Sequence, residues 1–132
     1  MSKKLSPDER NRLKKLFKEN GLSPDDVFSH NHFTIITRSG IEKIQAKKNI
    51  FVSYEIESLA PDFVVVKAFG EMETAEGAVR VETYGESSPK NNKTSYPVAM
   101  AEKRALSRVV LKLAGLYSEP GVIGEDEKPQ DE

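Results

Sequence analysis

Three consecutive segments of the chain have the residue pattern of β-strands, and short turns join them. They are residues 50–57 (IFVSYEIE), 63–73 (FVVVKAFGEME) and 77–86 (GAVRVETYGE). The first alternates in side-chain character, and all three are rich in β-branched and aromatic residues. Because the connections at 60–62 and 74–77 have the length of hairpin turns, we expect the segments to form an antiparallel meander.

A long helix is expected directly after this array. Residues 85–95 are polar and rich in turn formers, and the segment from Pro97 to Ala114 then has helical periodicity before Gly115. Successive turns of 100° place one broad apolar arc on this helix, formed by Val98, Ala101, Ala105, Leu106, Val109, Val110, Leu113 and Leu116. We expect that arc to pack across one face of the sheet, as a β-β-β-α core.

The amino-terminal part adds helices to this core. Residues 6–21 begin with Ser6 as a cap and Pro7 at the first helical position, and they end at Gly21. The pattern then predicts a helical turn, a polar loop, a short strand and a second helix at residues 23–26, 29–32, 33–36 and 39–48. The predicted fold class is therefore α+β, with a three- to four-stranded antiparallel sheet.

The composition limits the chemistry that this chain can perform. Its 132 residues suit one domain, which we place at 1–118, followed by an acidic and disordered tail at 119–132. The absence of cysteine excludes disulfides and thiolate chemistry and suggests a cytoplasmic protein. No apolar run approaches the roughly 18 residues of a membrane span. His30 and His32 have no third ligand nearby, so we predict no metal site there.

Charge is distributed unevenly along the chain. The whole chain has 20 basic and 21 acidic residues, and the last fourteen residues hold six acids and one base. Residues 1–118 therefore keep 19 basic and 15 acidic residues, a net charge of +4. This pattern fits a polyanion-binding domain whose tail competes for its own binding site, and it fits an ordinary solvated tail equally well.

The most distinctive feature of the long helix is a stripe of cations. Arg104, Arg108 and Lys112 recur every fourth residue, with Lys103 to one side and the small residues Ala101 and Ala105 along the border. Either the stripe tracks phosphates, with the alanines allowing a close approach, or it pairs with carboxylates of the sheet. The sheet carboxylates considered are Glu55, Glu57 and Glu82.

Groups around the start of this helix favour the phosphate interpretation. The preceding loop supplies cations and neutral donors, namely Lys90, Asn91, Asn92 and Lys93. Tyr84 and Tyr96 flank the loop and are candidates for base stacking. On the helix itself, Met100, Leu111 and Ala114 form a second apolar edge. That edge is either buried within the domain or shared between subunits, and we favour a homo-oligomer.

The segment TYGE (83–86), SSPKNNKTS (87–95) and YPVAMAEKRALSRVVLKLAGL (96–116) resembles the signature of phage single-strand annealing proteins. These are the Erf-type group and related recombination proteins, distantly akin to the eukaryotic Rad-group annealing mediators. Residues 36–50 (ITRSGIEKIQAKKNI) also resemble the segment that precedes the sheet in small phage members.

This resemblance implies annealing of complementary DNA strands, assembly into rings or filaments, and no cofactor or catalytic residue. It places the DNA groove at Arg104 and Arg108, with Lys103, Lys112 and the loop 90–93 nearby. A phage exonuclease or a host single-strand binding protein are the partners expected. Two alternatives stay open: an assembly or regulatory protein that binds no DNA, and a magnesium-dependent nuclease using Glu71, Glu73, Glu82 and Glu86.

Overall fold

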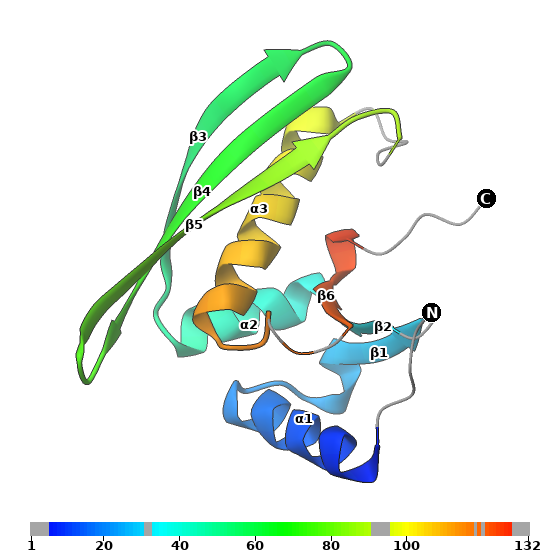
Figure 1. The fold of residues 1–132 in the computed structure, drawn as a ribbon, viewed down its shortest axis with the longest axis vertical. Coiled ribbons are helices and arrows are strands. Elements are labelled where there is room, and N and C mark those ends of the chain that lie inside the picture. The colour runs from blue at the N-terminus through cyan, green and yellow to red at the C-terminus, as the bar shows by residue number, and fades with distance from the viewer. Residues whose placement is uncertain (1–5, 31–32, 91–95, 118, 120, 128–132) are drawn as a thin grey trace.

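The computed structural model describes residues 6–30, 33–90, 96–117, 119 and 121–127. Within these residues the chain forms three α-helices, two short 3₁₀ turns and two three-stranded sheets (Figure 1). The predicted α+β class is therefore confirmed.

The larger sheet is the predicted antiparallel meander. Its strands are β3 (Phe51–Ala60), β4 (Phe63–Thr74) and β5 (Gly77–Ser87), in the order β3-β4-β5. A bulge interrupts the pairing of β3 between Ile56 and Ser58. Along β4, every second side chain from Val64 to Gly70 is buried. One face of the sheet is therefore covered, and the other is open to solvent.

Helix α3 (Pro97–Leu113) covers the buried face, chiefly over β4 and β5 (Figure 1). Its contact with β5 is close, because a methyl group added at Gly85 would lie 2.0 Å from the carbonyl oxygen of Ala101. Thr83 reinforces the contact by donating its hydroxyl proton to the Ala105 carbonyl oxygen at 2.8 Å. Ala101 and Ala105 are fully buried. Our interpretation that these alanines control the approach of a phosphate is therefore wrong: they control the approach of helix to sheet.

The amino-terminal elements lie beyond α3 from the large sheet, where helix α2 (Arg38–Lys47) contacts α3 (Figure 1). Helix α1 (Pro7–Glu19) starts with a reciprocal capping box between Ser6 and Glu9. The turn η1 (Pro24–Asp26) leads into β1 (Val27–His30), which pairs antiparallel with β2 (Phe33–Ile36). Helix α2 follows, and its cap is Thr37 rather than the expected Ser39. The strand at 33–36 is as predicted, but it joins this second sheet and not the meander.

Two predicted irregular segments are ordered elements instead. Ser29 and His30, expected in a polar loop, belong to β1, whereas His32 lies outside the described residues. The expected disordered tail contains β6 (Val122–Gly124), which pairs in parallel with β2, and the turn η2 (Glu125–Glu127). The backbone hydrogen bonds of this pairing replace hydration of the segment, so residues 122–127 are part of the domain.

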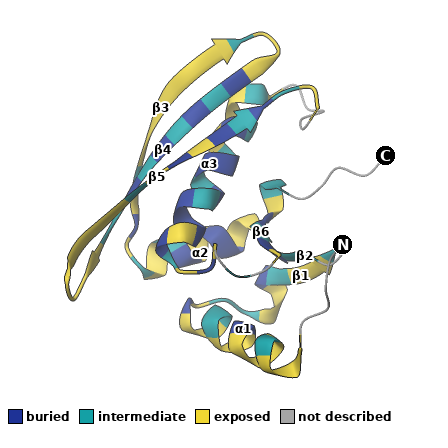
Figure 2. Cartoon of the chain, viewed as in Figure 1, coloured by how far each residue is buried: buried dark blue, intermediate teal, exposed yellow. Residues whose placement is uncertain are grey.

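Helix α3 is thus the middle layer of the molecule, with the large sheet on one side and α2 and β6 on the other (Figure 1). Its second apolar edge finds partners inside the chain, because Leu111 is 2% exposed and belongs to the same core cluster as Ile41 and Ile44. Figure 2 shows buried residues on successive turns of α3, as expected for a helix covered on both sides. The second edge therefore no longer argues for an oligomer.

Candidate nucleic-acid interface

Arg104 and Arg108 belong to α3, and their side chains reach the carboxyl-terminal end of β5. Strand β5 is an edge strand of the sheet. Arg104 donates from Nη1 to the carbonyl oxygen of Glu86 at 2.9 Å, and Arg108 donates from Nη1 to the carbonyl oxygen of Tyr84. Carbonyl groups on the outer side of an edge strand otherwise have no partner in the sheet. The two guanidinium groups therefore close this end of the edge.

Arg108 sits between two carboxylates. It donates to both oxygens of Glu86, at 2.9 and 3.0 Å, and its Nε donates to both oxygens of Glu127 at 3.0 Å. Burial opposes the charge of Arg108, but the hydrogen bonds to Glu86 and Glu127 outweigh burial and raise the pKa of the guanidinium. The hydrogen bond from Arg108 in turn lowers the pKa of Glu86.

Arg104 is more deeply enclosed than Arg108, with only 5% of the residue exposed. Its Nε donates to the backbone carbonyl oxygen of Asp126 at 3.1 Å. Burial lowers the pKa of Arg104, against the attraction of Glu127 and Glu86. Arginine nevertheless keeps its charge at any physiological pH. The site therefore contains a buried cation that binds backbone oxygens of two separate chain segments.

Of the two alternatives for the basic stripe, the structure contains intramolecular pairing: Arg108 pairs with carboxylates, and Arg104 donates to backbone carbonyl oxygens. The carboxylates involved are Glu86 and Glu127, and Glu82 instead pairs with Lys67 at 3.2 Å. The expected partners Glu55 and Glu57 form no ion pair with the stripe in the described part of the chain. One of the two carboxylates paired with Arg108 thus comes from the carboxyl-terminal segment and not from the sheet.

The other predicted cations surround this pair without joining it. Lys103 is half-buried and close enough to Asp126 to lower the pKa of that carboxyl, although burial of Asp126 raises the pKa by more. Lys112 is exposed one turn further along α3, with its Nζ 5.7 Å from the ring centre of Tyr117. Lys90 is exposed, and Asn91, Asn92 and Lys93 lie outside the described residues.

The two predicted stacking residues are both exposed, Tyr84 to 47% and Tyr96 to 69%. Tyr96 directly precedes α3. Tyr84 projects to the open face of the sheet, because its neighbours Thr83 and Gly85 face α3. There, Lys67 Nζ lies 5.4 Å from the centre of the Tyr84 ring and 5.2 Å from that of Phe69. The ring of Tyr84 and the guanidinium of Arg108 are thus on opposite sides of one strand.

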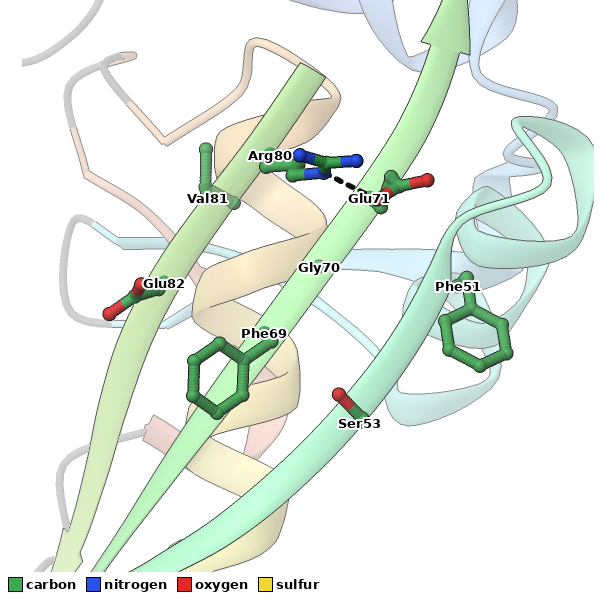
Figure 3. A pocket seen from close by; sticks show the side chains of 8 residues that line it. All are labelled: Phe51, Ser53, Phe69, Gly70, Glu71, Arg80, Val81 and Glu82. Carbon is green, nitrogen blue, oxygen red and sulfur yellow. Dashed lines mark hydrogen bonds and ion pairs between the residues drawn. The ribbon is translucent and has the colours of Figure 1, made fainter. Parts of the chain in front are cut away.

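The open face of the sheet also contains a hollow of about 440 Å³ that sequence reasoning missed (Figure 3). Its lining residues are Phe51, Ser53, Phe69, Gly70, Glu71, Arg80, Val81 and Glu82. Phe51 is 73% exposed, and Arg80 reaches from β5 to Glu71 on β4 at 2.6 Å. The alternation of β3 and β4 was the available signal, since it places Phe51, Phe69 and Glu71 on one face.

Most of the carboxylates considered for a nuclease form ion pairs with lysine or arginine side chains. Glu71 pairs with Arg80, Glu82 with Lys67, and Glu86 with Arg108. Across the described residues, no group of three or more acidic or histidine side chains is arranged to hold a metal ion. The geometry therefore offers this alternative no support.

Comparison with protein-family models, curated proteins and solved structures finds no match for this chain. None of the helices in the described ranges is long and apolar enough to cross a membrane. The resemblance to annealing proteins therefore rests on the sequence signature alone.

Proposed function

We propose that this chain binds single-stranded DNA and anneals complementary strands without a nucleotide cofactor. The observation that carries the proposal is the cluster of basic side chains around one run of acidic residues. Arg38, Lys103, Arg104 and Arg108 surround Glu125–Glu127 through hydrogen bonds, ion pairs or electrostatic attraction. A site that binds consecutive anionic side chains has the positive charge and the hydrogen-bond donors that also bind a sugar-phosphate backbone.

The rings on the open face support a single strand in preference to a duplex. A backbone that follows the α3 side of β5 leaves its bases free to reach around the strand edge towards Tyr84. Stacking on aromatic rings is typical of proteins that bind single strands with little sequence preference. Annealing then needs no catalytic group, because base pairing between two exposed strands supplies the free energy.

Self-association supports annealing as well, and we propose a homo-oligomer in the form of a ring or filament. Strand β3 offers the surface, because α3 leaves its helix-side residues uncovered (Figure 2). Tyr54, Ile56 and Leu59 are 40%, 54% and 66% exposed. A row of exposed apolar side chains on an edge strand favours contact with another protein. A cytoplasmic location, with a phage exonuclease or host single-strand binding protein as partner, completes the proposal.

The test is binding and annealing by the native chain and by Lys103→Ala. Lys103 borders the site and has no part in closing the strand edge, so its loss leaves the fold intact. We expect Lys103→Ala to weaken binding of a fluorescein-labelled oligothymidine several-fold. We also expect the slope of log affinity against log salt to fall by about 0.7, the value for one phosphate contact to a single strand.

The matched control is Lys15→Ala, which removes the same charge from an exposed position of α1. It should bind and anneal like the native chain. Complementary labelled strands, mixed with each protein, report annealing directly. Equal affinity and equal salt slope for the native chain and Lys103→Ala would contradict the site, and absence of salt-dependent binding by the native chain would contradict the function.

A further inference from the structure

The segment Glu125–Glu127 lies on the proposed DNA site and makes contacts at three successive residues. Glu125 Oε1 accepts a hydrogen bond from the backbone nitrogen of Arg38, at the start of α2, at 2.9 Å. The Asp126 carbonyl oxygen accepts from Arg104, and the Glu127 carboxylate accepts from Arg108. One short run of acidic residues therefore spans the beginning of α2 and two turns of α3.

The strand before it, β6, anchors the segment by pairing in parallel with β2 and by burying Val122. Strand β6 has three residues and η2 has three, and one side of β6 rests against α3 where Gly124 meets Ser107. Glu125 is exposed, and burial raises the pKa of the Asp126 carboxyl, so its ionised form is costly where it lies. Short elements with few contacts open locally at a small fraction of the free energy of global unfolding.

Release of the segment leaves the arginines positioned. Arg104 keeps its hydrogen bond to the Glu86 carbonyl oxygen, and Arg108 keeps its bonds to the Tyr84 carbonyl oxygen and to the Glu86 carboxylate. Both guanidinium groups then present the donors that Asp126 and Glu127 had occupied. Because hydrogen bonds to β5 already order the two guanidinium groups, binding of a ligand in place of the segment has a small cost in side-chain conformational entropy.

Release also changes the charge of the site. With the segment in place, its three acidic side chains lie against Arg38, Lys103, Arg104 and Arg108. With the segment away, Arg108 keeps its ion pair with Glu86 and Arg38 keeps its ion pair with Glu42. The site therefore becomes strongly attractive to a polyanion only when Glu125–Glu127 leaves it.

We propose that Glu125–Glu127 is an intrachain competitor that occupies the path of the DNA backbone and must be displaced when a strand binds. This competition rests on the proposed function and adds its regulation: affinity for single strands is set by how readily η2 and β6 detach. Conditions that weaken the Arg108–Glu127 ion pair then also favour release of the segment.

The experiment compares binding of fluorescein-labelled oligothymidine by the native chain and by a triple variant, Glu125→Gln, Asp126→Asn and Glu127→Gln. The triple variant is expected to bind on the order of tenfold more tightly at low salt, because the strand no longer displaces charged side chains. The control removes three exposed acids elsewhere, Glu19→Gln, Glu73→Gln and Glu76→Gln. The control should bind within about twofold of the native chain, because remote charges are screened.

A second variant tests release without any change of charge. Gly124→Ala puts a methyl group 2.6 Å from Ser107 Oγ, so β6 has to move away from α3. It should also tighten binding, by a smaller factor than the triple variant. In the native chain, amide hydrogen exchange of residues 122–127 should become faster when the oligonucleotide is added.

The outcomes separate the two proposals. If the native chain and both variants bind the strand with the same affinity, and exchange at 122–127 is unchanged by DNA, the function stands and the competition is wrong. If none of the proteins binds the strand at any salt concentration, the proposed function is wrong and the competition falls with it. Tighter binding by both variants, with faster exchange in the native chain, supports both.

Discussion

Arg104 and Arg108 each combine a structural role with a charge that a ligand can use. They hold the outer carbonyl groups of β5, and Arg104 is almost fully buried while doing so. Removing Arg104 leaves the partly buried Glu86 carbonyl oxygen without this donor, which costs up to about 1–3 kcal/mol, whereas water can replace Arg108 at the exposed Tyr84 carbonyl oxygen. Loss of DNA binding after such a substitution would mix unfolding with loss of contact, so Lys103 is the cleaner probe.

The ion pair between Glu86 and Arg108 makes stability depend on pH. Because the pKa of Glu86 is lowered in the folded chain, its contribution is fully present above the unfolded value near 4.5 and is lost as pH falls through the folded pKa. We expect Glu86→Gln to lower Tm at neutral pH by about 4 °C, as for ~1 kcal/mol in a partly solvated pair.

The measurement is thermal unfolding of both proteins between neutral pH and about pH 3. The difference in Tm should shrink as the solution becomes acidic. Glu76→Gln, at an exposed turn, serves as the control and should match the native chain throughout. A difference for Glu86→Gln that stays constant down to the lowest pH would mean that the side chain contributes something other than its charge.

At the scale of elements, the joint between α3 and β5 determines the geometry of the site. Gly85 allows the helix backbone to approach the strand, and Thr83 bonds to the helix at Ala105. This closeness brings the guanidinium groups of α3 within reach of the strand edge. Two elements that packed at an ordinary helix-to-sheet distance would leave the arginines to solvent.

Gly85→Ala should be strongly destabilising for this reason. The added methyl group would overlap the Ala101 carbonyl oxygen and the Ala105 nitrogen, which are backbone atoms and cannot rotate away. We expect a loss of about 3 kcal/mol or more in the free energy of unfolding, measured by urea denaturation.

The control for this substitution lies on the same strand. Ala78→Val adds bulk at an exposed position of β5 and should change stability by no more than about 0.5 kcal/mol. If Gly85→Ala were as stable as Ala78→Val, α3 could not lie as close to β5 as described here.

At the scale of the whole molecule, the three layers leave a row of apolar side chains on β3 exposed, at Tyr54, Ile56 and Leu59. The middle layer, α3, is covered on both sides, whereas the residues of β3 that face the helix side stay exposed. The acids of β3, Glu55 and Glu57, are also exposed and maintain solubility along this edge. Any self-association of the chain should therefore involve β3.

The double substitution Ile56→Glu and Leu59→Glu should disrupt the proposed self-association without unfolding the chain, because both side chains are more than half exposed. Sedimentation and native mass measurement should give the mass of a single chain at concentrations where the native protein assembles. Val79→Glu changes an exposed valine at the other end of the sheet and should assemble normally. Unimpaired assembly of the double variant would place the interface elsewhere.

The large sheet and α3 could be predicted because their signals are local and repeated. Alternation over many residues and a long helical arc determine β3, β4, β5 and α3 within one to three residues. Strands β1 and β6 could not, because each has at most four residues and depends on pairing with β2. The sequence shows that the carboxyl-terminal segment is acidic. It does not show that this segment lies against α3, because the path of the chain after Gly115 depends on tertiary contacts and not on a local pattern.

Gly85, Ala101, Ala105, Arg104 and Arg108 together make the helix-to-sheet joint, and they lie in the segment 83–116 whose sequence resembles annealing proteins. Such a motif would persist in evolution wherever this way of closing a three-stranded sheet persists, whatever the protein binds. A search for distant relatives based on these residues would therefore group proteins by architecture. Functional divergence among them should be visible at the positions around the joint, of which Lys103 and residues 125–127 are the first to compare.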